Sequence, residues 1–277
     1  IIGFINVLEY INTYTLIKKY KLHKWSKLIV FKGCTIDYEM LDKKEINYTI
    51  YLWDSIKNIY NGPRYSKMNS KVMTFDIQDS LDYNFFYLPL FHFRGDNILD
   101  DNFTSIKNQF RDKVSLYGSY SEDRVRLLNV ISLNNQENIK LHYILTISPL
   151  IFMREIILRK QSITLLWKYT SFRKLTRKRI NDLLRTSVYT IDLANPNQTG
   201  MTSRTFEALS FSTKIVTNNK TTIQFCESMN IPVLYADFNL GLDENSISSF
   251  KKESFSIPND FIIEFSINSF LKKILKY

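Results

Sequence analysis

One segment constrains the fold of this chain more than any other: a polar, glycine-containing loop enclosed by two apolar runs. Residues 187–193 read Ser-Val-Tyr-Thr-Ile-Asp-Leu, a β-branched run that predicts a buried strand. The loop contains Gly200, and Thr202 or Ser203 can cap the helix that follows it. A second strand is predicted at 214–217. Strand, loop, helix and strand in this order are typical of α/β proteins.

The start of the helix after this loop is suited to hold an anion, because free backbone N–H groups and the helix dipole both point at it. We therefore expect a diphosphate to contact Gln198, Thr199, Gly200, Met201 and Thr202. Arg204 adds a cation in the first turn, and Glu207 lies one turn further on, toward the hydroxyl groups of the same ligand. The structural alternatives are a glycine that relieves a tight turn, an arginine in a surface salt bridge and a glutamate on a plain helix face.

The rest of the chain alternates strand and helix signals in two series, which favours mostly parallel sheets covered on both faces. The first series predicts strands at 27–31, 47–53, 71–75 and 85–88. A polar segment follows, and the second series predicts strands at 113–118, 141–146, 164–168, 187–193, 214–217 and 232–235. Helices are expected over 122–133, from Pro149 to about 160, over 171–184 and over 260–276. We predict a domain at 1–92, a linker at 93–112 and a domain at 113–277.

Carboxylates near strand ends are candidates for acid–base chemistry. Asp54 follows the predicted strand 47–53, at the carboxyl edge where α/β folds place ligands. A carboxylate there can accept the proton of a sugar hydroxyl, so Asp54 is our candidate catalytic base. The alternative is that Asp54 caps the helix that follows. Asp76 and Asp79 are second-choice carboxylates.

Four blocks of the sequence resemble one family, the bacterial glycosyltransferases of capsule and O-antigen clusters related to CgeB-like proteins. The first block is Pro-Asn-Gln-Thr-Gly-Met-Thr-Ser-Arg-Thr-Phe-Glu-Ala-Leu at 196–209, followed by Lys-Ile-Val-Thr-Asn-Asn at 214–219. The others are Ile-Tyr-Leu-Trp-Asp-Ser-Ile-Lys-Asn at 50–58, Thr-Phe-Asp-Ile-Gln-Asp at 74–79 leading to Phe-Tyr-Leu-Pro-Leu-Phe at 86–91, and Val-Ser-Leu-Tyr-Gly-Ser at 114–119 followed by Asp-Arg at 123–124. Together they span roughly residues 28 to 235.

The resemblance implies a GT-B fold, in which two Rossmann-like domains face each other across a cleft and the last helix packs back on the first domain. It implies a nucleotide-diphospho-sugar donor, a glycan or lipid-linked glycan acceptor and a cytoplasmic location. It also implies that Gly118 and Ser119 approach the donor phosphate, and that Glu207 is the second acid of an E-x7-E pattern that holds the donor ribose. Arg124, one turn into the next helix, either adds charge at that phosphate or is a solvated helix residue. The first acid of that pattern falls at Thr199, so the chain departs from it. Compared with the family, the first domain lacks its opening strand, and we expect a truncated start.

Composition excludes several other classes of protein. No run of apolar residues reaches the length of about 18 that is needed to span a bilayer. The two cysteines, Cys34 and Cys226, lie far apart and are expected to be reduced and buried. No zinc motif and no Asp-x-Asp tripeptide occurs, so we expect no metal and no cofactor. The chain carries a formal net charge of +10 but no nucleic-acid-binding motif, so nucleic acid is not an expected partner.

Five basic residues lie close together in one segment, and two roles are possible for them. Arg173, Lys174, Arg177, Lys178 and Arg179 can hold the protein peripherally at the inner face of an anionic membrane, or they can form a solvated face. Two alternatives to a transferase also stay open. One is a nucleotide-sugar epimerase on the same fold, and the other is a truncated, non-catalytic protein that binds a glycan or a partner.

Overall fold

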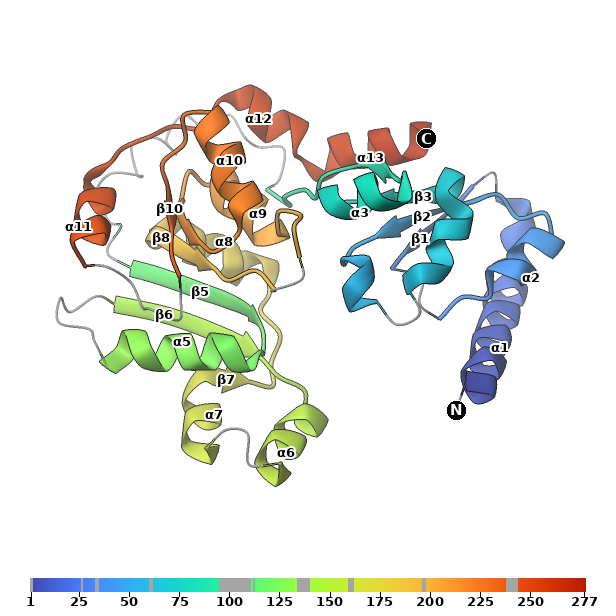
Figure 1. Ribbon diagram of the computed structural model, residues 1–277, viewed down its shortest axis with the longest axis horizontal. Coiled ribbons are helices and arrows are strands. Elements are labelled where there is room, and N and C mark those ends of the chain that lie inside the picture. Colours follow the sequence, from blue (N-terminus) through green and yellow to red (C-terminus); the bar gives the residue numbers. More distant parts are fainter. Residues whose placement is uncertain are drawn as a thin grey trace. The chain divides into compact units, whose positions relative to one another are not determined.

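The computed structural model describes residues 2–25, 27–32, 35–59, 62–94, 111, 113–133, 140–158, 162–195, 198–237 and 244–277. The chain divides into two compact units (Figure 1). Unit 1 consists of residues 1–90, 195–201 and 268–277, and unit 2 of residues 91–194 and 202–267. Most of the predicted linker at 93–112 lies outside the described residues, as do Cys34 and Pro196.

Unit 1 is built on a four-stranded parallel sheet in the order β1-β2-β3-β4. Its strands are β1 (Leu28–Phe31), β2 (Tyr48–Leu52), β3 (Val72–Thr74) and β4 (Phe86–Tyr87). Its helices are α1 (Ile2–Tyr20), α2 (Tyr38–Lys43), α3 (Ile77–Tyr83) and most of α13 (Ile267–Lys276), with 3-10 turns at η1 (Leu22–Lys24), η2 (Ile56–Asn58) and η3 (Gly62–Lys71). Every residue of β2 is buried, as expected for a parallel strand that is covered on both faces.

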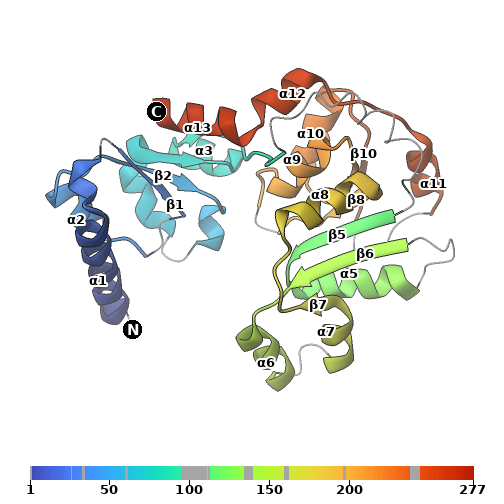
Figure 2. The same ribbon diagram turned by 180° about the vertical axis from the view of Figure 1, so that it is seen from behind.

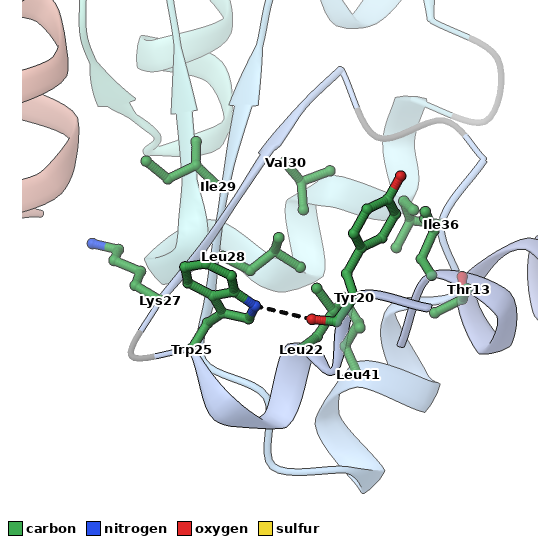
Figure 3. Close-up of a pocket in the computed structure, with 11 residues that line it drawn as sticks. Thr13, Tyr20, Leu22, Trp25, Lys27, Leu28, Ile29, Val30, Ile36 and Leu41 are labelled. Carbon is green, nitrogen blue, oxygen red and sulfur yellow. Dashed lines mark hydrogen bonds between the residues drawn. The ribbon is translucent and has the colours of Figure 1, made fainter. Parts of the chain in front are cut away.

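Aromatic side chains join α13 to the sheet of unit 1. Phe270 packs edge-on against the buried ring of Tyr51, with ring centroids 4.9 Å apart, and lies 6.3 Å from the ring of Phe31. At the other side of the unit, α1 and β1 enclose an apolar groove of about 490 Å³ (Figure 3). Trp25 lies at this groove, and its indole N–H donates to the carbonyl of Tyr20 at 3.0 Å.

Unit 2 contains a six-stranded parallel sheet in the order β10-β9-β8-β5-β6-β7. The strands are β5 (Lys113–Ser119), β6 (Lys140–Thr146), β7 (Thr170–Ser171), β8 (Ser187–Asp192), β9 (Lys214–Thr217) and β10 (Val233–Tyr235). The helices are α5 (Glu122–Leu133), α6 (Pro149–Ile157), α7 (Ile163–Tyr169), α8 (Arg177–Thr186), α9 (Ser203–Ser210), α10 (Lys220–Ser228), α11 (Glu244–Lys252) and α12 (Asn259–Glu264). The strand order reverses between β5 and β8. In open α/β sheets, ligands bind at the carboxyl ends of the strands at such a switch point.

Three sequence predictions are wrong in detail. The expected strand at 164–168 is the helix α7, because Ser162 caps it by accepting the N–H of Leu165 at 3.2 Å. The basic helix begins at Arg177 rather than at 171, because Thr176 caps it. The expected last helix is two helices, α12 and α13. They are separated where Ser266 forms a parallel bridge with His92, whose carbonyl accepts the N–H of Ile267 at 3.1 Å.

Other predictions are confirmed. The helix from Pro149 and the helix over 122–133 are present as α6 and α5. Cys226 is a free, buried thiol, and burial raises its pKa to about 12. Among the described residues, no helix combines the length and the apolar character that crossing a bilayer requires.

Candidate functional site

A buried carboxylate organises the switch point of unit 2. Asp192 ends β8 and is fully buried. Its side chain accepts from the Thr202 hydroxyl at 2.6 Å, the Thr205 hydroxyl at 2.8 Å and Nε of Arg204 at 2.9 Å. Burial alone would raise the pKa of this carboxyl, but the charge of Arg204 and the two hydroxyl donors outweigh it and hold the pKa below its usual value. Asp192 thereby fixes the first turn of α9, and the predicted cap at Thr202 is confirmed.

Two guanidinium groups converge on Gly118 at the end of β5. A Cβ atom on Gly118 would lie 3.3 Å from Nη1 of Arg204 and 3.5 Å from Nη1 of Arg124, and the φ angle of Gly118 is +151°. Arg124 donates to the carbonyls of Ser119 at 2.7 Å and of Leu193 at 3.0 Å. Arg204 also donates to the Leu193 carbonyl, at 3.3 Å. Glycine is favoured here because other residues rarely adopt this φ angle, and because a Cβ atom would come close to the Arg204 guanidinium.

The charge at this point is not balanced by the groups in contact with it. Arg124 and Arg204 carry two positive charges, and Asp192 is the one carboxylate that the described residues place in hydrogen-bond contact with either guanidinium. Burial, and then the charge of Arg204, lowers the pKa of Arg124 to about 9. The Arg204 side chain remains 17% exposed. An anion that reached both guanidinium groups would relieve their repulsion and could take bidentate hydrogen bonds.

Glu207 lies one turn further along α9 and is already engaged. One carboxylate oxygen accepts the hydroxyl of Tyr117 at 2.8 Å, and the other is paired with Arg177. Arg177 also stacks on Phe93, with 4.2 Å from its guanidinium carbon to the ring centroid. Arg177 is exposed, as expected for this basic segment, but its guanidinium is engaged with Glu207 of unit 2.

The loop residues that we expected to bind phosphate lie in unit 1 and contact a different acceptor. The backbone N–H groups of Thr199 and Gly200 both donate to Asp76, at 2.9 and 3.1 Å, and the Thr199 hydroxyl also bonds to it. A Cβ atom on Gly200 would lie 2.6 Å from the carbonyl oxygen of Phe75, so only glycine permits this approach. The side-chain amide N–H of Gln198 donates to the carbonyl of Gly200 within the same loop, at 3.1 Å. Met201 is buried.

Asp76 thus links the loop at 199–200 to the start of α3, a role that the sequence did not predict. It caps α3 by accepting the N–H of Gln78 at 3.0 Å, and it accepts the hydroxyl of Ser55. Burial would raise its pKa, but the bonds from Ser55, Thr199 and Gly200 hold the pKa below its usual value. The sequence does show an aspartate at the end of a strand and just before a helix, which is typical of a helix cap. It gives no sign of the contact with the loop, which lies more than a hundred positions later in the chain.

Asp54, our candidate base, lies at the end of β2 on the surface of unit 1. Its carboxylate contacts the ammonium of Lys32 at 3.2 Å and the amide of Asn58 at 3.3 Å. The alternative that it caps the next helix is wrong, because Ser55 occupies the cap position of η2. The Asp54 side chain is 27% exposed.

The pKa of Asp79 is shifted in the opposite direction from that of Asp76. It is buried and accepts the N–H of Ile56 at 2.7 Å, and burial raises its pKa to about 6. The described residues contain no cluster of three or more His, Cys, Asp or Glu side chains that could hold a metal ion.

We expect Asp79→Asn to stabilise the protein above about pH 7 by about 1–3 kcal/mol, and to have little effect below about pH 4. A carboxyl whose folded pKa is raised contributes stability that is present below its unfolded pKa and is lost as the pH rises through about 6. Asparagine still accepts the N–H of Ile56 but does not ionise. Urea unfolding at both pH values measures the difference. Asp82→Asn, an exposed change on the same helix, is the control, and an equal gain from that variant would contradict the assignment.

No protein-family model matches the sequence, and no curated protein sequence matches it. Solved structures do resemble the fold. The crystal structure of a UDP-forming alpha,alpha-trehalose-phosphate synthase from Burkholderia xenovorans has a TM-score of 0.63 at 11% identity, over 97% of this chain and 77% of that one. An apo structure of OtsA has a TM-score of 0.54 at 12% identity, over 99% and 76%. At such identities the likeness concerns the fold, and it confirms the predicted α/β fold with two Rossmann-like sheets of the GT-B type.

Proposed function

We propose that the chain is a glycosyltransferase that transfers a sugar from a nucleotide-diphospho-sugar to a glycan or lipid-linked glycan acceptor. The observation that supports this most is the pair of arginines at the switch point of unit 2, around the side-chain-free surface of Gly118. A nucleoside diphosphate is the leaving group of such a transfer, and two fixed guanidinium groups neutralise the charge that develops on it. The GT-B type of fold, shared with a UDP-forming synthase, supports the same reaction class.

In this proposal the acceptor hydroxyl forms a bond to the anomeric carbon while the bond from that carbon to the diphosphate oxygen breaks. Asp54 takes the hydroxyl proton, and Arg124 and Arg204 hold the departing diphosphate. Ser119 accepts a hydrogen bond from Arg124, and Thr202 shares the Asp192 carboxylate with Arg204. Glu207 offers its remaining lone pairs to the donor ribose. Gln198, Thr199, Gly200 and Met201 keep a proposed role toward the donor, which requires that the diphosphate replace Asp76 at the loop amides.

The biological setting follows from the sequence resemblance. We propose a role in surface polysaccharide biosynthesis at the cytoplasmic face of the membrane, where lipid-linked acceptors are available. The decisive experiment is incubation of the purified protein with UDP-, GDP- and CMP-sugars, with and without a lipid-linked oligosaccharide. Nucleotide release that depends on the acceptor supports transfer. Conversion of the donor sugar without any acceptor would instead identify an epimerase, and the absence of nucleotide binding would identify a non-catalytic protein.

We expect donor binding and transfer to survive EDTA. The arginine pair supplies the positive charge that a divalent ion supplies in metal-dependent transferases, and no Asp-x-Asp sequence is present. Titration of the nucleoside diphosphate by calorimetry in EDTA and in Mn²⁺ measures this. Affinity lost in EDTA and restored by Mn²⁺ would refute the metal-independent mechanism.

A further inference from the structure

Helices α6 and α7 of unit 2 expose large apolar side chains to solvent. They project from the end of unit 2 beyond β7 in both views (Figures 1 and 2). Leu150 is 84% exposed, Ile157 71% and Trp167 61%. The exposed apolar side chains of this region form a surface that we call the α6–α7 face. Its residues are Leu150, Met153, Ile157, Ile163, Trp167 and Phe172. Leu150, Met153 and Ile157 are spaced three and four apart, so they line one face of α6.

The α6–α7 face is held in place by a small core behind it. Phe152 and Leu166 are buried together with Ile147. Phe152, Trp167 and Phe172 form a ring cluster, with centroids 5.0 Å apart for Phe152 and Trp167, and 5.8 Å for Trp167 and Phe172. The exposed side chains therefore belong to packed helices, and the apolar surface continues through Phe172 to the basic segment that follows it.

Along the chain segment that carries this face, the charge is almost all positive. Between positions 149 and 181, Glu155 is the only acidic residue of the sequence, and it is buried, paired with Arg154 at 2.6 Å and bonded to Tyr120 at 3.1 Å. The exposed basic residues of this segment include Lys168, Arg173, Lys174 and Lys178. A second copy of the chain seated on this face would bring like charges together. An anionic partner with an apolar interior complements both properties.

We infer that the α6–α7 face docks on the surface of an anionic bilayer. Its aliphatic side chains and Trp167 enter the boundary between headgroups and acyl chains, while the neighbouring lysines and arginine contact the lipid phosphates. Arg177 takes no part, because it is paired with Glu207. This inference is independent of the proposed reaction, and its tests need no donor or acceptor.

The first test compares two variants that lose the same charge. Lys168, Arg173 and Lys174 are changed to Gln in one variant, and Lys18, Lys19 and Lys21 of unit 1 in the other. With vesicles of equal parts phosphatidylcholine and phosphatidylglycerol, the first variant should partition on the order of a hundred-fold more weakly than wild type, at about 1 kcal/mol for each basic residue. The second should partition as wild type does. Equal losses would show that only net charge matters and would overturn the inference, as would unchanged binding of the first variant.

The second test locates the inserted side chain. Single-tryptophan variants keep either Trp167 or Trp25, the latter beside the apolar groove of unit 1, and the other two tryptophans become Phe. Vesicles with brominated acyl chains should quench Trp167 and leave Trp25 unquenched. Quenching of Trp25 alone would place the contact on unit 1 and overturn the inference. Loss of vesicle binding in Leu150→Ser/Ile157→Ser, with an unchanged melting temperature, would support it, because both side chains are exposed.

Discussion

Arg204→Ala is expected to lower the free energy of unfolding by about 3–5 kcal/mol, because it leaves the buried carboxylate of Asp192 without its cation. The two threonine hydroxyls that remain bonded to Asp192 do not neutralise its charge. Urea unfolding near neutral pH measures the loss. We attribute this loss of stability to the broken ion pair between Arg204 and Asp192 and not to lost packing alone. A second variant that also removes the charge of Asp192 separates the two causes.

The double variant Arg204→Ala/Asp192→Asn should regain most of the lost stability. Asparagine accepts from Thr202 and Thr205 as the carboxylate does, and it brings no buried charge. If the double variant is as unstable as Arg204→Ala, the cost comes from the cavity left by the arginine, and the electrostatic account is refuted.

The second large effect is the contribution of Arg204 to nucleotide binding. The double variant Arg204→Ala/Asp192→Asn measures it without the loss of stability of Arg204→Ala. We expect its affinity for the nucleoside diphosphate to fall by about 1.5–3 kcal/mol, or roughly ten- to a hundred-fold, because one charged hydrogen-bond donor to phosphate is gone. Calorimetry on the wild type and on the stable double variant measures the difference. Arg126→Ala is the matched control, because Arg126 lies on the same helix as Arg124 but is exposed and pairs with Asp123.

Two results would contradict a phosphate role for Arg204. One is unchanged affinity in the double variant, and the other is an equal loss in Arg126→Ala. A loss that appears in Arg204→Ala and disappears in the double variant would mean that the single variant binds poorly because it is partly unfolded.

The sequence predicted what local chemistry determines. The helix that follows Gly200 and its cap at Thr202 could be placed because a capping hydroxyl and an apolar helix face occur within a few residues. The parallel sheets could be predicted from the alternation of strands and helices. The helix α7 was mistaken for a strand, because its short apolar run has no clear period and only the Ser162 cap distinguishes the two.

The partners of the candidate site could not be predicted, because they come from elements far apart in sequence. Asp192 was an unremarked strand-end residue, and its importance follows from the position of α9 against β8. Glu207 meets Tyr117 and Arg177 only because β5 and α8 lie beside α9. Asp76 meets Gly200 across 124 positions, a pairing for which neither local sequence gives a signal.

The aromatic contact between α13 and the sheet of unit 1 has a consequence for synthesis of the chain on the ribosome. Tyr51 belongs to a strand made early, whereas Phe270, which packs on it, is translated after the whole of unit 2. Unit 1 therefore lacks the ring that covers Tyr51 until every segment of unit 2 has been translated. In a nascent chain that has emerged only as far as residue 267, every segment of unit 2 is present, whereas the Tyr51 ring of unit 1 is still without its partner Phe270.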